Sequence, residues 1–277
     1  YNAGGTITTL TNNGLISGSS STYLGYGLGN AGGTITKLTN NGLISGSDSG
    51  IGNAGGTITT LTNNGLISGS DFGIDNEGGE ITTLINNGLI SGSDTGIYNT
   101  GGTIETLINN GLIISGSDSG LGNAGGTIET LTNNGLIISD SDSGIYNDRE
   151  ITKLTNNGLI SGFFYGIHNT EGTITILTNN SLISGSGSGV WNNGGGTIET
   201  LINNGLISDS DSGIYNDGGT IGTLTNNGLI SDSGILNERG TIGTLTNNGL
   251  ISDSGILNER GTIGTLTNNG LISDSGI

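Results

Sequence analysis

Four ring-bearing residues recur at one position in consecutive repeats of this sequence. They are Tyr146, His168, Trp191 and Tyr215, and each is followed directly by an asparagine. Exposed rings in a row can stack on the faces of sugar rings, as amphipathic rings do at many binding surfaces. The same rings could instead stack on one another across neighbouring strands and stabilise a sheet. The row is therefore a candidate glycan-binding strip, with cross-strand stacking as the alternative interpretation.

A second distinctive row is acidic. An aspartate recurs in the serine-rich segment of most repeats, at Asp48, Asp71, Asp94, Asp118, Asp142, Asp211, Asp232, Asp253 and Asp274. Carboxylates one repeat apart repel each other, and Ca²⁺ would relieve the repulsion because it binds several carboxylate and carbonyl oxygens. The spacing matches neither an EF-hand loop nor the Gly-Gly-x-Gly-x-Asp calcium repeat.

Two interpretations of the acidic row stay open. In one, the aspartates form weak Ca²⁺ sites, for which the candidates are Asp48, Asp71, Asp94, Asp118 and Asp142. In the other, they are solvated acids that cap turns through local hydrogen bonds. Apart from this calcium, we expect no cofactor.

Residues for an enzyme active site are scarce. The chain has no Cys, a single His and five Lys plus Arg residues. Two of these, Arg239 and Arg260, belong to identical repeats. A nucleophile, a base and an orienting group cannot be assembled from such spacing. We therefore expect a protein that is not an enzyme.

The element that must position these residues is a tandem repeat. Its typical copy starts at Gly50, and the sequence contains twelve copies, the first of them incomplete, with 21 to 24 residues per typical copy. A period in this range indicates a solenoid, and abundant Gly and β-branched residues disfavour helices. We predict a single all-β domain over residues 1–277, a parallel β-helix of about 12 coils.

The apolar residues of the repeat predict a stacked core. The positions equivalent to Ile58 and Leu61 are Ile and Leu, respectively, in all twelve copies, and the positions of Ile67 and Ile51 are almost as uniform. Changes in repeat length fall mostly in turns, including an extra segment around Ser20–Tyr26. A single coil buries too little to be stable alone, so stability must come from neighbouring coils.

Two asparagines of each repeat are expected to point inward by strand alternation. A buried amide needs hydrogen bonds, which stacked copies can supply as a ladder. The predicted ladders contain Asn53, Asn76 and Asn99 in one column and Asn63, Asn86 and Asn109 in the other. The glycines that follow the asparagines are expected to supply positive φ at the corners.

Two features predict self-association. Alternation points Leu66 and its equivalents outward, where they would form a continuous ridge that favours lateral pairing. The last repeat ends in the phase in which the first begins, so we expect either an excerpt of a longer array or a fibre subunit that stacks end to end.

The charge of the chain limits its partners. A formal charge of -18 and a pI near 4.1 argue against nucleic acid and anionic membranes, which are themselves polyanionic. No apolar run exceeds three residues, so we expect no membrane insertion.

The repeat resembles a known group of proteins. The stretch Asn63-Asn64-Gly65-Leu66-Ile67, the phrase Gly-Thr-Ile-x-Thr-Leu and the Cys-free richness in Gly, Asn, Thr and Ser are similar to repetitive passenger regions of bacterial autotransporters and other large surface exoproteins. The resemblance covers the whole chain. It implies a right-handed parallel β-helix, secretion to the cell surface, and a stalk, adhesin or matrix role.

The function predicted from these observations is structural. We expect a non-enzymatic, extracellular structural or adhesive repeat protein that forms a rigid rod or filament at the cell surface. The alternative is an adhesin that binds surface glycans through Tyr146, His168, Trp191 and Tyr215.

Overall fold

The chain forms a parallel β-solenoid of about 11 turns with three sheets, which confirms the predicted fold class. A computed structural model describes residues 1–19 and 25–273, and none of these residues is helical. Asp274 of the acidic row and most of the extra segment after Ser19 lie outside the described residues. The chain divides into two units, Tyr1–Ser141 and Asp142–Ile277.

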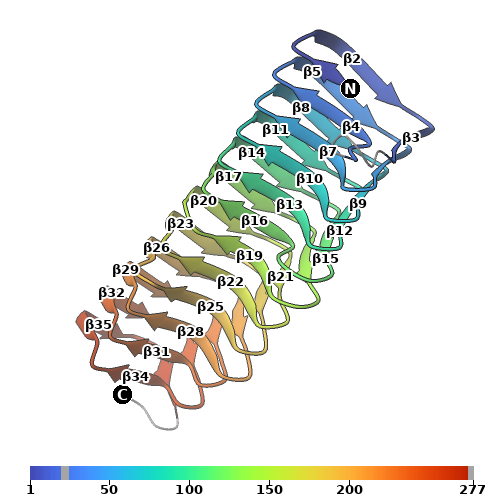
Figure 1. Ribbon diagram of the computed structural model, residues 1–277. Coiled ribbons are helices and arrows are strands. Elements are labelled where there is room, and N and C mark those ends of the chain that lie inside the picture. The colour runs from blue at the N-terminus through green and yellow to red at the C-terminus, as the bar shows by residue number, and fades with distance from the viewer. Residues whose placement is uncertain (20–24, 274–277) are drawn as a thin grey trace. The chain divides into compact units, whose positions relative to one another are not determined.

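The first unit contains six parallel strands in each sheet, and each coil contributes one strand to sheets A, B and C in turn (Figure 1). Sheet A comprises β1 (Asn2–Ala3), β4 (Leu28–Ala31), β7 (Ser49–Ala54), β10 (Phe72–Glu77), β13 (Thr95–Thr100) and β16 (Leu121–Ala124). Sheet B comprises β2 (Thr6–Asn12), β5 (Thr34–Asn40), β8 (Thr57–Asn63), β11 (Glu80–Asn86), β14 (Thr103–Asn109) and β17 (Thr127–Asn133). Sheet C comprises β3 (Leu15–Gly18), β6 (Leu43–Gly46), β9 (Leu66–Gly69), β12 (Leu89–Gly92), β15 (Leu112–Ser115) and β18 (Leu136–Ser139).

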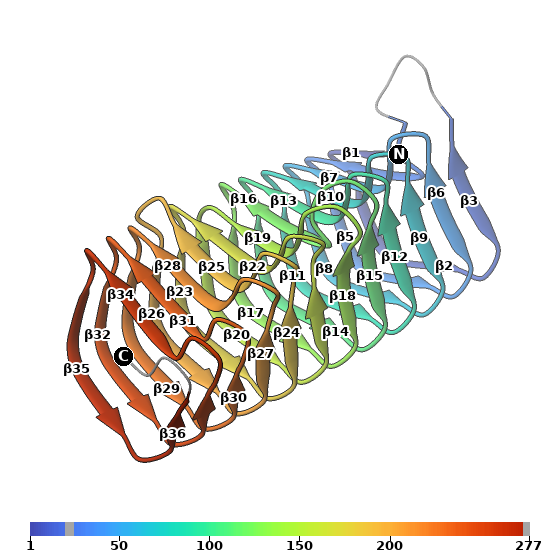
Figure 2. The same ribbon diagram turned by 90° about the horizontal axis from the view of Figure 1, so that it is seen from below.

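The second unit repeats this arrangement, and its strands of sheet C are visible in Figure 2. Sheet A comprises β19 (Ser143–Asn147), β22 (Tyr165–Thr170), β25 (Ser188–Asn193), β28 (Ser212–Asp217), β31 (Ile235–Glu238) and β34 (Ile256–Glu259). Sheet B comprises β20 (Glu150–Asn156), β23 (Thr173–Asn179), β26 (Thr197–Asn203), β29 (Thr220–Asn226), β32 (Thr241–Asn247) and β35 (Thr262–Asn268). Sheet C comprises β21 (Leu159–Ser161), β24 (Leu182–Ser184), β27 (Leu206–Ser208), β30 (Leu229–Ile230), β33 (Leu250–Ile251) and β36 (Leu271–Ile272).

The core of each unit consists of the predicted apolar columns. In the typical coil Ile51, Ile58, Leu61 and Ile67 are completely buried. Ile58 is aligned with Ile81 and Leu61 with Leu84 in the parallel register of β8 and β11. Each apolar residue therefore stacks on its counterpart one coil away, and burial is shared between coils.

Sheet B departs from strict alternation to bury both of its apolar residues. Ile58 and Leu61 lie three residues apart, so a regular strand would point them to opposite faces. Thr59 and Thr60, between them, are both half-exposed, and the paired register of β8 and β11 omits the position of Thr59. A local irregularity at this position turns Leu61 back into the core.

Glycine is required at the two corners for different physical reasons. Gly55, in the corner between sheets A and B, has a φ of 61°, as predicted. The expectation of positive φ is wrong for Gly65, in the corner between sheets B and C, which has none. A Cβ at residue 65 would lie 2.1 Å from the carbonyl oxygen of Gly42, so close coil stacking demands glycine there.

Both predicted asparagine ladders are present. In sheet A, the Nδ2 of Asn53 donates to the Oδ1 of Asn76 at 2.8 Å, and Asn76 donates to Asn99 at 2.7 Å. In sheet B, Asn63 donates to Asn86 and Asn86 to Asn109, both at 2.8 Å. All these side chains are completely buried. Each Nδ2 also donates to turn carbonyls, such as that of Gly56 from Asn53, at 3.0 Å.

A third asparagine ladder runs along the surface beside the second one. The Nδ2 of Asn64 donates to the Oδ1 of Asn41 at 2.8 Å, and Asn87 donates to Asn64 at 2.9 Å. These side chains are exposed to solvent. The second asparagine of the Asn-Asn pair therefore forms its own column, which alternation alone did not predict.

Candidate functional site

The four predicted ring residues all lie on sheet A of the second unit, one on each of β19, β22, β25 and β28. The His168 ring stacks on Trp191 with a centroid distance of 4.4 Å and an interplanar angle of 18°. Trp191 stacks on Tyr215 at 6.3 Å and 16°, while Tyr146 meets His168 edge-on at 5.4 Å. The rings therefore form one continuous cross-strand stack, as the alternative interpretation expected.

Tyr165 joins this stack and was missed from the sequence. Its ring lies 4.4 Å from Trp191 and 5.2 Å from His168, measured between centroids. Alternation from the buried Ile167 would point Tyr165 inward, but Gly166 is buried as well and both flanking rings are half-exposed. The Gly-Ile pair before the ring position breaks the alternation, and this pair is the signal from which Tyr165 could have been found.

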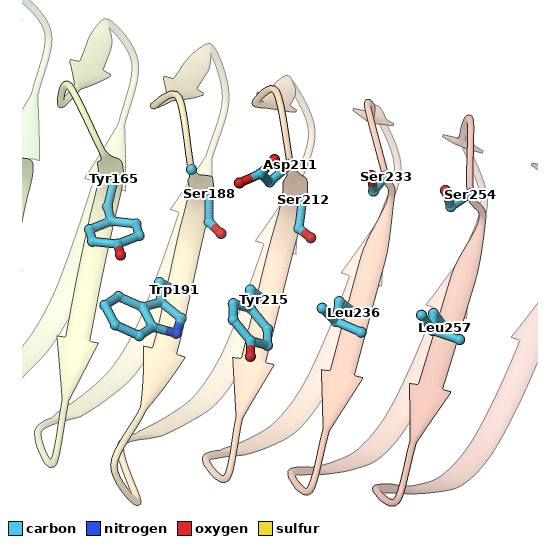
Figure 3. Close-up of a pocket in the computed structure, with 11 residues that line it drawn as sticks. Tyr165, Ser188, Trp191, Asp211, Ser212, Tyr215, Ser233, Leu236, Ser254 and Leu257 are labelled. Carbon is cyan, nitrogen blue, oxygen red and sulfur yellow. The ribbon is translucent and has the colours of Figure 1, made fainter.

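A groove of about 460 Å³ begins at these rings and crosses sheet A of the second unit. Figure 3 shows two rows across successive strands. One row contains Trp191, Tyr215, Leu236 and Leu257, and the other contains Tyr165, Ser188, Ser212, Ser233 and Ser254, with Asp211 beside it. An apolar strip thus runs beside a strip of hydroxyl groups, which is a surface suited to an amphipathic, extended ligand.

Hydrogen bonds fix two of the rings. The hydroxyl of Tyr215 donates to Glu238 Oε2 at 2.8 Å, and burial followed by this bond raises the pKa of Tyr215 well above its ordinary value. His168 Nε2 lies 3.3 Å from Asn193 Oδ1. The buried Nε1 of Trp191 has no hydrogen-bond partner. Among the described residues that line the groove, Asp211 alone is charged, so the charge of the groove disfavours anionic ligands.

A buried carboxylate lies in the turn that leads into β28. Asp209 occupies the position held by glycine in many coils, is only 5% exposed, and has an Oδ2 atom without a hydrogen-bond partner. Its backbone N–H donates to Asp232 Oδ2 at 2.8 Å. Burial, reinforced by the charges of Asp211 and Asp232, raises the pKa of Asp209 to about 7.

The acidic row of the first unit is held by turn hydrogen bonds. The backbone N–H of Asp71 donates to the carbonyl of Asp48, and that of Asp94 to the carbonyl of Asp71. The Ser117 hydroxyl donates to Asp94 Oδ1 at 2.6 Å, and a hydrogen bond to Asp48 raises the pKa of Asp71. Asp142 belongs to the second unit, where burial raises its pKa.

This geometry fits acids that cap turns. Within residues 1–19 and 25–273, no group of three or more His, Cys, Asp or Glu side chains comes together in a way that could hold a metal ion.

The first unit covers its own sheet A with rings. Gly52 lies beneath the ring of Tyr26, which a Cβ at residue 52 would meet at 2.5 Å, and Gly29 lies beneath the ring of Tyr1 and beside that of Tyr26. Phe72 stacks on Tyr98 at 4.9 Å and 11°. Asp75 is buried beside Tyr26, and this burial, together with the charge of Glu77, raises the pKa of Asp75 to about 6. Stacking across rungs of sheet A is therefore common to both units.

Comparisons with protein-family models, curated proteins and solved structures found no match to this chain. In the part of the chain that the structure describes, no helix is long and apolar enough to cross a membrane.

Proposed function

We propose that this chain is a non-enzymatic structural or adhesive segment of an extracellular protein, and that it provides a rigid rod at the cell surface. The observation that carries this proposal is the constancy of the ladders. Their Asn–Asn bonds stay between 2.7 and 2.9 Å across coil spacings of 21, 23 and 24 residues. Within each unit, coils that repeat the same bonds resist bending and shearing.

The extracellular location rests on the resemblance of the repeat to surface exoproteins.

We extend the proposal to filaments formed by end-to-end stacking of copies. Residues 219–239 and 240–260 are identical in sequence. These identical coils already stack within the chain, where Asn226 donates to Asn247 at 2.9 Å and Asn237 to Asn258 at 2.7 Å. The repeat is therefore complementary to itself, and contact between two chains needs no surface of a different kind.

Negative-stain electron microscopy over a concentration series, with and without Ca²⁺, tests the filament. We expect particles that lengthen with concentration. Particles of one short length at every concentration would contradict end-to-end stacking, and filaments that need Ca²⁺ would support Ca²⁺ binding by Asp48, Asp71, Asp94, Asp118 and Asp142.

The second candidate function is glycan binding, which is favoured by the groove beside Trp191 and Tyr215. Its apolar row would contact the C–H faces of sugar rings, while its serines and Asp211 would bind sugar hydroxyls. The acidic lining favours a neutral or cationic glycan.

A glycan array probed with the intact chain and two double variants tests this function. We expect Trp191→Ala with Tyr215→Ala to lose at least about tenfold in affinity, equal to about 1.4 kcal/mol. The matched control, Phe72→Ala with Tyr98→Ala, removes a ring stack from the first unit and should bind normally. Equal binding by both variants, or no bound glycan, would exclude the groove.

A further inference from the structure

The outer face of sheet C in the first unit is an unbroken apolar column. From β6 to β18, each strand begins with a solvent-accessible leucine followed by a completely buried isoleucine, as in Leu89 and Ile90, whereas both residues are accessible in β3. The parallel register aligns these leucines from coil to coil, in the order Leu43, Leu66, Leu89, Leu112 and Leu136. We call this column, together with the outward residue two positions later in each strand, the leucine face. Leu66 and its equivalents therefore point outward, as predicted.

The leucine face widens at β15 and β18. Serine is the second outward residue in the earlier strands, but Ile114 and Ile138 occupy that position here and are paired in register. With Leu112 and Leu136 they form a continuous apolar patch, in which Leu136 is 40% exposed. Beside it lies a shallow recess of about 320 Å³, lined by glycine and serine together with Ile114 and Asp140.

Charge separates this face from the rest of the first unit. Its six strands of sheet C contain no Asp, Glu, Lys or Arg. Sheet A carries Asp75 and Glu77, and sheet B carries Glu80, Glu105 and Glu129. The aspartates of the acidic row follow these strands in the adjoining turns and not on the strands themselves. In a chain with a formal charge of -18, two copies therefore repel each other least when the uncharged strands of sheet C meet.

The spacing of the column selects its partner. Leucines one coil apart are separated by the strand spacing of a sheet, about 4.8 Å. Side chains interdigitate along a whole column only if the opposing surface has the same spacing, as in the dry interfaces between stacked sheets. A second copy of this chain has the same spacing because its leucines lie on the same strands, whereas the surface of a globular protein does not.

We propose that the leucine face of the first unit binds the same face of a second copy of this chain. The contact is isologous, since each copy contributes the same patch. This inference deepens the structural function proposed above, because it names the face at which neighbouring rods associate side by side.

Matched lysine variants of the full chain, followed by sedimentation velocity over a concentration series, test the proposal. Leu89→Lys with Leu112→Lys places two charges on the leucine face. Thr83→Lys with Thr106→Lys places the same charges on the outer face of sheet B in the same two coils. Both variants reduce the net negative charge equally, so general repulsion falls equally in both. Circular dichroism melting checks that each variant is folded.

We expect side-by-side dimers of the wild type and of the threonine variant, and at least about tenfold weaker dimerisation of the leucine variant, equal to about 1.4 kcal/mol. Equal dimerisation of the two variants would overturn the proposal, as would a wild type that forms no lateral dimer. Filaments that persist in the leucine variant would leave end-to-end stacking intact, so the two proposals fail separately.

A cysteine experiment identifies the face if the leucine variant does not fold. The chain has no cysteine, so an introduced thiol is unique. Ser45→Cys, Ser68→Cys and Ser91→Cys lie on the leucine face, and Thr39→Cys, Thr60→Cys and Thr83→Cys lie on sheet B of the same coils. At least one variant, or mixture of two variants, of the sheet C set should form disulfides between chains about tenfold faster than the variants of the sheet B set. The reason is that association raises the effective concentration of facing thiols. Equal rates in the two sets would overturn the proposal.

Discussion

The neighbouring residues Asn63 and Asn64 belong to two ladders of the same chemistry in different surroundings. Each donates an amide-to-amide bond of 2.8 Å to the adjacent residue of its column, Asn63 to Asn86 and Asn64 to Asn41. Asn63 is completely buried, and its Nδ2 also donates to the carbonyls of Gly65 and Leu89, whereas Asn64 is exposed. Although the two bonds are equally long, loss of the Asn63 bond should cost more stability than loss of the Asn64 bond, because water can replace lost hydrogen bonds only in the exposed column.

The largest effect is expected from an isosteric replacement in each column. Asn63→Asp removes the Nδ2 donor and places a carboxylate among buried acceptors, so it should lower the free energy of unfolding by about 3 to 5 kcal/mol. Asn64→Asp makes the same chemical change at the surface and should cost about 0.5 kcal/mol. Chemical denaturation of both variants measures the difference. A similar loss in the two would show that burial does not distinguish the ladders.

In the corner after these asparagines, two reciprocal substitutions should change stability in opposite directions. Ser181 occupies the position held by Gly65 in the typical coil, and its N–H donates to Asn179 Oδ1 at 3.3 Å, whereas the Gly65 N–H donates to a backbone carbonyl of the previous coil. The following bond, from Leu182 N to Gly158 O, is 3.3 Å, compared with 2.9 Å for Leu66 N to Gly42 O.

Crowding of the Ser181 Cβ explains the longer bond from Leu182 N to Gly158 O. We expect Gly65→Ser to destabilise by about 2 kcal/mol, because overpacking typically costs about 1 to 3 kcal/mol. Ser181→Gly should stabilise by about 1 kcal/mol, since relief of that crowding exceeds the entropy that a glycine adds to the unfolded chain. Thermal melting of the pair measures both changes, and a lower melting temperature for Ser181→Gly would refute this explanation.

Burial also acts on carboxylates, and its effect should appear as a pH dependence. The pKa of Asp209 is raised to about 7 and that of Asp75 to about 6, from an ordinary value of 3.8. The folded state therefore binds more protons than the unfolded state between about pH 4 and 7, and stability falls as the pH rises through this range.

Melting temperatures between pH 4 and 8 test this sign. Wild type should melt a few degrees lower at pH 7.5 than at pH 5, and Asp209→Asn should flatten part of that slope. Asp94→Asn is the matched control, because it removes one carboxylate charge as Asp209→Asn does, but from an exposed position. A slope that is unchanged by Asp209→Asn but altered by Asp94→Asn would contradict the assignment.

The sequence predicted the interior better than the surface. Ile58, Leu61 and the inner asparagines recur in every coil, so period and alternation located them, although Ile58 and Leu61 required an irregular strand between them. Tyr165 was missed because Gly166 breaks the alternation. Tyr26 was missed for the same reason, because it precedes Gly27 and Leu28 at the repeat position that Tyr165 occupies in its own coil, and its cover over Gly52 depends on tertiary packing.

The opposite directions of the ladders give each unit an electrical polarity. Asn63 donates to Asn86 in the following coil, and Asn53 donates to Asn76 in the same sense, whereas Asn64 donates to Asn41 in the preceding coil. Each amide carries a dipole, and hydrogen-bonded amides in a chain polarise one another. Two columns therefore point one way and one points back, which leaves a net dipole along the stacking direction. A coil inserted upside down would set donors against donors on one side and acceptors against acceptors on the other in each column, so the stack accepts coils in a single orientation.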